Sequence, residues 1–344
     1  MTKMIRMAPL AFLATAALAV AVSDGTWTNK APLPVGRAEV GVAALGDNIY
    51  VIGGTEQDAQ GHTNYASTLN TVYDARRNSW EQRAPLPLGL SHVGVAALAG
   101  KIYAVGGFTN IVHMNPQAVA FVYDPKTNRW SQLPVLSNPR GSVAVAAVGG
   151  RLHLFGGRLS NKVTRVPLPP GAPELFAGYG TVTTHQVFDP ATGRWAEGSP
   201  IPGPARDHLG IAVLGSKVHL FGGRIADFGD NLDRHDVYDT ANDTWSTAAP
   251  LPVARSAGAA TVLDGHIIYA GGECKPSAQP PSTDAYDDVT SYDPKTNLWS
   301  KLTPLPTARH AFGAATVNNV AYFMGGAPVC GGGATTDTYA LTLR

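Results

Sequence analysis

The chain has 344 residues, of which 44% are hydrophobic and 15% are charged, so it can bury a large core and is not compositionally disordered. Its formal net charge is +1, and no run of Lys or Arg is longer than two residues. This balance excludes the basic surface expected of a protein that binds nucleic acid or an anionic membrane surface. The 38 glycines and 26 prolines recur along the chain, which is typical of many turns between short strands.

The first segment of the chain has the layout of a secretory signal peptide. Lys3 and Arg6 precede an apolar stretch from Ala8 to Val22. This stretch is shorter than the roughly 20 residues that a membrane-spanning helix needs, which disfavours the alternative of an uncleaved anchor. We therefore expect residues 1–23 to be a signal peptide and residues 24–344 to form one domain of a secreted or periplasmic protein, with no membrane span in the mature chain.

A repeating unit then runs through the rest of the chain. Six apolar segments end in double glycines, at intervals of roughly 50 to 65 residues, which is a period that indicates a propeller or an array. The pairs are Gly53-Gly54, Gly106-Gly107, Gly156-Gly157, Gly222-Gly223, Gly271-Gly272 and Gly325-Gly326. An aromatic-Asp pair follows in five units, and a tryptophan stands six positions after each Asp: Trp80, Trp130, Trp195, Trp245 and Trp299. A Pro-rich connector and another apolar strand complete four strands per unit.

These residues resemble the kelch family, whose motif is a strand ending in double glycine, a Tyr-Asp pair and a spaced tryptophan. The resemblance covers essentially the whole chain after the signal segment. It implies an all-β fold, namely a six-bladed β-propeller with four antiparallel strands per blade around a central channel. The sixth unit has no spaced tryptophan of its own, whereas Trp27 precedes the connector that begins at Ala31. We expect this N-terminal strand to close the ring, because closure removes an open sheet edge.

The segments after the double glycines are expected to form the binding face. Antiparallel geometry puts them on the same face as the Pro-rich connectors, and it puts the short Asp-to-Trp turns on the opposite face. They differ in length and sequence, and variable loops on one face of a rigid scaffold usually carry binding. Idle surface loops are the alternative.

An arginine recurs at the start of the first strand in five units, and Leu90 replaces it in the second. The five are Arg37, Arg140, Arg206, Arg255 and Arg309. In the kelch resemblance they lie near the channel mouth, so they are candidate ligand-binding residues for carboxylates or other anions, together with Asp207 and His310 one position later. The alternative is a structural role in which each arginine pairs locally and holds the blades together.

Two positions after this arginine slot, the six units differ: Glu39, His92, Ser142, His208, Ala257 and Ala311. Glu39, His92 and His208 are candidate catalytic residues for acid-base chemistry, or candidate metal ligands, if they face one another across the channel. No spacing motif for a metal is present, so we predict neither a metal nor a cofactor.

Cys274 and Cys330 each follow a double glycine, in the fifth and sixth units. In an exported protein, two such cysteines favour a disulfide over free thiols or a soft-metal pair.

The function expected from these features is that of a binding module, which recognises a carbohydrate or protein ligand with its loop face. The layout also resembles that of exported sialic acid mutarotases, which implies a carbohydrate-active enzyme as the alternative. A resemblance to galactose oxidase would imply a copper radical enzyme. That enzyme has seven propeller units and needs a Cys-Tyr cofactor, whereas this sequence has six units and its two cysteines are predicted to pair with each other.

Overall fold

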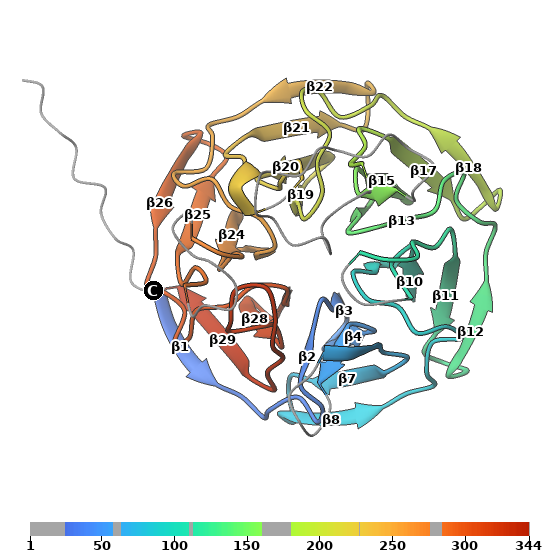
Figure 1. Cartoon of the computed structure of the whole chain (residues 1–344), viewed down its shortest axis with the longest axis horizontal. Coiled ribbons are helices and arrows are strands. Elements are labelled where there is room, and N and C mark those ends of the chain that lie inside the picture. The colour runs from blue at the N-terminus through green and yellow to red at the C-terminus, as the bar shows by residue number, and fades with distance from the viewer. Residues whose placement is uncertain are drawn as a thin grey trace, which may run out of the picture.

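The computed structural model describes residues 25–57, 63–109, 113–159, 180–226, 228–275 and 284–343. Six four-stranded antiparallel sheets stand in a ring around a central channel (Figure 1). The predicted six-bladed propeller is confirmed. The predicted signal peptide lies outside the described residues. Within the described ranges, we find no helix with the length and apolar character needed to cross a bilayer.

Each blade is a sheet whose strands follow one another from the channel outward. Blade 1 contains β3 (Gly41–Leu45), β4 (Asn48–Ile52), β7 (Asn70–Asp74) and β8 (Ser79–Gln82). Blade 2 contains β9 (Gly94–Leu98), β10 (Lys101–Val105), β11 (Ala120–Asp124) and β12 (Arg129–Gln132). Blade 3 contains β14 (Ala144–Val148), β15 (Arg151–Phe155), β17 (His185–Asp189) and β18 (Arg194–Glu197).

The second half of the ring repeats this order, apart from the strand that closes it. Blade 4 contains β19 (Gly210–Leu214), β20 (Lys217–Phe221), β21 (His235–Asp239) and β22 (Thr244–Thr247), with a 3-10 turn η2 (Phe228–Asp230) before β21. Blade 5 contains β23 (Ala259–Leu263), β24 (His266–Ala270), β25 (Val289–Asp293) and β26 (Leu298–Lys301). Blade 6 contains β27 (Gly313–Val317), β28 (Val320–Met324), β29 (Thr338–Leu343) and the N-terminal strand β1 (Gly25–Asn29).

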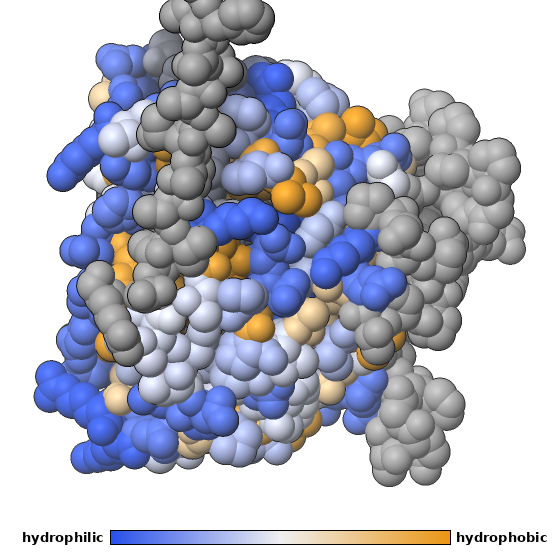
Figure 2. Space-filling view, turned by 90° about the vertical axis from the view of Figure 1, so that its left-hand side faces the viewer, coloured by the Kyte–Doolittle hydropathy of each residue, from blue (hydrophilic) through white to orange (hydrophobic). Residues whose placement is uncertain are grey.

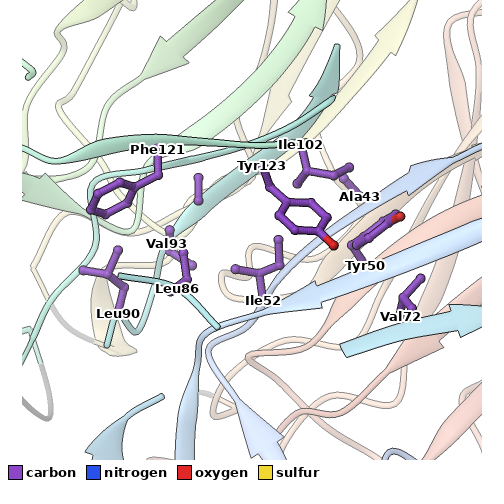
Figure 3. Packing of buried hydrophobic residues seen from close by; sticks show 11 residues of the cluster. Ala43, Tyr50, Ile52, Val72, Leu86, Leu90, Val93, Ile102, Phe121 and Tyr123 are labelled. Atoms are coloured by element: carbon purple, nitrogen blue, oxygen red, sulfur yellow. The ribbon is translucent and has the colours of Figure 1, made fainter. Parts of the chain in front are cut away.

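The core lies between the faces of neighbouring blades. The second strand of each blade is buried on both faces, because a blade stands on either side of it, whereas outer strands such as β8 are largely exposed. Figure 3 shows one such interface, in which side chains of blades 1 and 2 form a single apolar cluster. The flank of the ring that Figure 2 shows is mainly hydrophilic, with small apolar patches.

The double glycines are joints between blades. Gly53 and Gly54 have φ angles of +63° and +97°, and a Cβ on Gly53 would lie 2.3 Å from the carbonyl oxygen of Leu90 in the next blade. Such a close approach at positive φ requires glycine. In every blade the second glycine donates its N–H to the carbonyl oxygen of the arginine-slot residue of the following blade: Gly54 to Leu90, Gly107 to Arg140, Gly157 to Arg206, Gly223 to Arg255, Gly272 to Arg309 and Gly326 to Arg37.

The tryptophans form a second ring of contacts between blades. Each indole Nε1 donates to a carbonyl oxygen in the Pro-rich connector before it, for example Trp80 to Ala31 at 2.8 Å and Trp130 to Ala84 at 2.8 Å. Trp27 makes the same contact with Thr303 at 3.1 Å, and β1 pairs antiparallel with β29. The predicted closure of the ring by the N-terminal strand is confirmed.

The predicted loop face is also present. The strand β2 (Arg37–Ala38) pairs with β5 (Thr55–Gln57), which pairs with β6 (Thr63–Ala66), and β13 (Arg140–Gly141) pairs with β16 (Arg158–Leu159). The starts of the first strands therefore meet the segments that follow the double glycines at one end of the channel.

Candidate functional site at the channel mouth

Six residues that lie two positions after the arginine slot encircle the channel at one level. Glu39, His92, Ser142, His208, Ala257 and Ala311 all have left-handed φ angles between 51° and 57°. This backbone turns their N–H groups toward the neighbouring blade, and each of the following donates to the equivalent carbonyl oxygen there: Glu39 to Ala311, His92 to Glu39, Ser142 to His92, Ala257 to His208 and Ala311 to Ala257. All six residues line the same channel. The ring therefore gathers residues from every blade.

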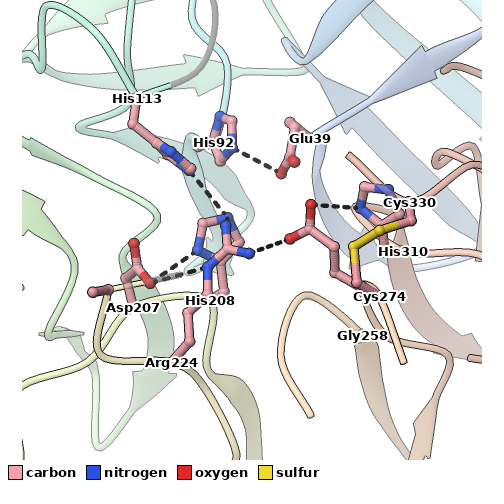
Figure 4. Close-up of polar contacts among 12 residues, drawn as sticks. Glu39, His92, His113, Asp207, His208, Arg224, Gly258, Cys274, His310 and Cys330 are labelled. Carbon is pink, nitrogen blue, oxygen red and sulfur yellow. Dashed lines mark hydrogen bonds and ion pairs between the residues drawn. A yellow bond between two sulfur atoms is a disulfide. The ribbon is translucent and has the colours of Figure 1, made fainter. Parts of the chain in front are cut away.

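Two of the candidate catalytic residues are in direct contact. His92 Nε2 lies 3.1 Å from Glu39 Oε2 (Figure 4). Burial alone would raise the pKa of Glu39, but the His92, His208 and His310 imidazoles outweigh it and lower this pKa to about 2. Glu39 is thus a firmly ionised carboxylate, which is well suited to binding and is a weak base.

Asp207 lies inside a network of this chain's own cations. It is fully buried, its Oδ2 accepts a hydrogen bond from Arg158 Nε at 2.6 Å, and its Oδ1 lies 3.1 Å from His208 Nδ1. Burial would raise the pKa of Asp207, but Arg158, His208 and Arg224 hold it well below its usual range. This carboxylate orients its neighbours. Because it is fully buried, it has little access to a ligand.

Arg224 and Glu273 form a buried ion pair at the centre of the site. Arg224 also lies 3.3 Å from His208 Nε2, and Glu273 Oε1 lies 3.8 Å from His310 Nδ1 (Figure 4). Arg158, Arg224 and Glu273 were not predicted from the sequence. Each is the first residue after a double glycine, so comparison of that single position across the six units would have found them.

His113 brings a third imidazole to the channel. It belongs to the segment after the double glycine of blade 2, and its Nε2 lies 3.4 Å from His208 Nε2. Its ring centroid is 4.7 Å from that of His92. Burial is the main cause that lowers the pKa of His113 well below 6.5, and it also lowers the pKa of His208. Both imidazoles are therefore neutral at ordinary pH. Sequence reasoning missed His113, because it stands in a variable loop with no counterpart in other units.

The slot arginines lie inside the blades. All five are at most 1% exposed. Arg37 Nη1 donates to the carbonyl oxygen of Gly53 at 2.9 Å, and Arg309 Nη1 donates to that of Gly325 at 3.0 Å. Burial lowers the pKa of Arg37 and of Arg140 to about 10. The sequence left two roles open for these arginines, ligand binding and a structural role. These contacts support the structural role, since a ligand would reach these guanidinium groups only if the blades opened.

A hollow opens above the ring on the loop face. Its walls include Glu39, His92, His113, Arg224, Glu273 and His310. His310 is held by a hydrogen bond from its Nε2 to the carbonyl oxygen of Val329 at 2.9 Å. The structure thus brings Glu39, His92, His208, Asp207 and His310 of the sequence prediction into one polar cluster.

The predicted disulfide is present beside this hollow. Cys274 and Cys330 are bonded, with their Cα atoms 4.9 Å apart. The bond joins the segments after the double glycines of blades 5 and 6, next to Glu273 and next to Gly331 in the wall of the hollow. Because these are the chain's two cysteines, neither is available for the Cys-Tyr cofactor of a galactose-oxidase-type enzyme.

Comparisons with known proteins agree with this architecture. Residues 175–326 match the KLHDC2/KLHL20/DRC7 Kelch-repeats domain model, and residues 89–135 match the Kelch motif model. The chain is a kelch-repeat β-propeller. A solved structure titled "Structure of YjhT" superposes on this propeller with a TM-score of 0.71, covering 91% of this chain and 99% of that one at 19% identity, which shows a shared fold.

Among curated relatives, this kelch propeller is 29% identical to Kelch-like protein terF of Aspergillus terreus, over 88% of this chain and 67% of terF. It is 29% identical to Kelch-like protein 40 of Xenopus tropicalis over 45% of this chain, and 26% identical to Beta-scruin of Limulus polyphemus over 49%. The matched regions cover 24% and 19% of those two longer proteins, so the likeness is to a part of each.

Proposed function

We propose that this kelch propeller is an exported binding protein that holds a small polar ligand of the carbohydrate class in the hollow on its loop face. One observation carries the proposal: charged and imidazole side chains from five of the six blades line this hollow. Glu39 and Glu273 bring carboxylates, Arg224 brings a guanidinium group, and His92, His113 and His310 bring imidazoles. Behind these side chains, the buried Arg158, Asp207 and His208 extend the polar network.

The recessed position of these groups favours a small ligand over a protein surface. The side chain of Glu39 is 17% exposed, that of Glu273 is 6%, that of His92 is 5% and that of Arg224 is 2%. A folded partner would contact the rim, whereas a small molecule can enter the hollow. Sugar hydroxyls both donate and accept hydrogen bonds, so they suit a wall that offers carboxylate acceptors beside guanidinium and imidazole donors.

Export is supported by two features that lie far apart in the sequence. The N-terminal segment has the charge and apolar pattern of a signal peptide. The bond between Cys274 and Cys330 fits an oxidising compartment, where structural disulfides persist.

Acid-base catalysis on the same ligand is the second candidate, in line with the resemblance to sialic acid mutarotases. The contact between Glu39 and His92 favours it, since paired groups of this kind can move a proton on a sugar. We rank it below binding, because a carboxyl whose pKa is about 2 is far from the pKa near neutrality that suits a general base.

The test is saturation-transfer NMR and calorimetry with neutral, amino and acidic monosaccharides. We expect one class to bind the wild type and to lose at least about tenfold in affinity with Glu39→Gln, since a buried charged hydrogen-bond partner is lost. Ser142→Ala is the matched control. Ser142 shares the ring level but lies outside the walls of the hollow, and alanine already occupies this position in blades 5 and 6.

The outcomes separate the alternatives. Accelerated anomer exchange by the wild type, lost in Glu39→Gln, would raise the enzyme above the binding protein. If no sugar binds while an extract protein is retained by wild type and by Glu39→Gln alike, the proposed small-ligand site is wrong and the loop rim binds a protein.

A further inference from the structure

Three imidazoles gather at one side of the channel. His92, His113 and His208 each offer one ring nitrogen, and these nitrogens all lie within 4.8 Å of one another. His92 lies in blade 2, His208 lies in blade 4 and His113 lies in a loop. No regular spacing in the sequence therefore identifies the three as a group. Among the residues that the structure describes, this is the group of His, Cys, Asp or Glu with the geometry to hold a metal ion.

The closest pair already has the spacing of metal ligands. Two nitrogens bound at about 2.0–2.1 Å to one tetrahedral zinc ion lie about 3.3–3.4 Å apart. His113 Nε2 and His208 Nε2 are 3.4 Å apart. The His92 nitrogen has to approach by no more than roughly 1.5 Å to complete a three-histidine site of the open type, in which a fourth position stays free.

The outer contact of His208 orients its ring as a metal-binding histidine requires. His208 Nδ1 faces Asp207 Oδ1 at 3.1 Å, so Nδ1 carries the proton and the Nε2 lone pair points toward His113. Carboxylate contacts of this kind fix the tautomer of metal-ligating histidines. His92 Nδ1 lies 3.2 Å from Ser91 Oγ. Arg224 Nη2 is 3.3 Å from His208 Nε2, and it would give up that contact to the ion while its ion pair with Glu273 remains.

The charge around the set also suits a cation. Glu39, Asp207 and Glu273 contribute three negative charges, while Arg158 and Arg224 contribute two positive charges. This buried cluster therefore contains one more carboxylate than guanidinium group. A divalent ion would be placed beside the Glu39 carboxylate, which lies 3.1 Å from His92.

We propose that His92, His113 and His208 bind a first-row divalent transition-metal ion of the zinc class at the floor of the hollow. Imidazole ligands suit zinc, copper, iron and nickel, and they disfavour calcium and magnesium. The free coordination position faces the hollow, where an oxygen of a bound molecule can reach the ion. This inference goes beyond sugar binding and does not depend on it.

The experiment uses the untagged, chelator-treated full protein with zinc alone. Calorimetry should show one Zn²⁺ per chain, and His113→Gln and His208→Gln should each weaken that binding by at least about tenfold, since even outer-shell changes cost 10- to 100-fold. Co²⁺ should give the intense visible bands of a four-coordinate site in the wild type. Calcium should not compete.

Two matched histidine variants control for nonspecific binding. His266→Gln removes a surface imidazole of β24, and His153→Tyr removes a buried imidazole of blade 3 where three other blades carry tyrosine. Neither should alter zinc affinity.

The Co²⁺ spectrum of the wild type reports the coordination of the bound ion even if a channel variant fails to fold. A wild type that binds no zinc at tens of micromolar, or loses it equally with His266→Gln, overturns the proposal. Sugar binding is measured without metal, so either proposal can fail alone.

Discussion

Arg255 Nη2 donates a hydrogen bond to Thr290 Oγ1 at 2.7 Å, entirely inside blade 5. Arg37 and Thr71 repeat this pair in blade 1. Blade 2 instead has Leu90 and Phe121 at these two positions, and both are members of one buried apolar cluster (Figure 3). In blades 1 and 5 the arginine slot is therefore one half of a polar pair, and in blade 2 the same slot is one half of an apolar pair.

This pairing predicts a coupled effect on stability. Leu90→Arg should lower the free energy of unfolding by about 3–5 kcal/mol, because it buries a charge opposite a phenyl ring. Leu90→Arg with Phe121→Thr should recover at least about 1 kcal/mol of that loss, as contacting residues couple. Urea denaturation measures both. Strictly additive effects would mean that the two positions do not sense each other.

Closure by the N-terminal strand predicts that Trp27 matters as much as an internal tryptophan. Trp27→Phe removes the hydrogen bond to Thr303 and part of the indole packing, which should cost about 1–3 kcal/mol. Trp130→Phe removes the corresponding bond to Ala84 and is the matched control. Urea denaturation measures both losses of unfolding free energy. A much smaller loss for Trp27→Phe than for Trp130→Phe would show that β1 is only loosely attached to its sheet.

The sequence specified the scaffold better than the site. Double glycines and spaced tryptophans recur because every interblade joint has the same backbone geometry, so blade number and closure were predictable. The placement of Arg37 was not, since an arginine near the channel and an arginine turned into a blade share one sequence signature. His113 was hidden for the opposite reason: its position has no counterpart in other units, and only the folded loop brings it within 3.4 Å of His208 Nε2.

The disulfide predicts a redox dependence of stability and of the hollow. Cys274 and Cys330 are 56 residues apart in sequence, and closing such a loop typically contributes about 2–4 kcal/mol. Reduction of the disulfide, or Cys274→Ser with Cys330→Ser, should lower the melting temperature. It should also weaken the binding of any ligand in the hollow, because Glu273 in its wall adjoins the disulfide. Thermal melts with and without reductant measure the first effect. Identical melts for bonded and reduced protein would contradict it.

Two buried histidine pairs predict acid sensitivity. His153 Nδ1 lies 3.0 Å from His185 Nε2 in blade 3, and His219 Nδ1 lies 2.9 Å from His235 Nε2 in blade 4. Burial is the largest cause that lowers all four pKa values from 6.5 to about 4. The unfolded chain therefore binds more protons than the folded one between these pH values. Stability is at its full value above pH 6.5 and falls as the pH drops toward 4, by up to about 1.4 kcal/mol per pH unit for each histidine.

Blade 1 supplies a replacement for such a pair. Tyr50 occupies the position of His219, and Asn70 Nδ2 donates to the carbonyl oxygen of Ala84 just as His235 Nδ1 donates to that of Ala249. We expect His219→Tyr with His235→Asn to fold and to reduce the slope of unfolding free energy against pH between 6.5 and 4.5 by up to about 2.8 kcal/mol per pH unit, which is the contribution of the two replaced histidines. Urea denaturation at half-unit pH steps gives this slope. An unchanged slope would place the acid-sensitive groups elsewhere, with the channel histidines as the next to be replaced.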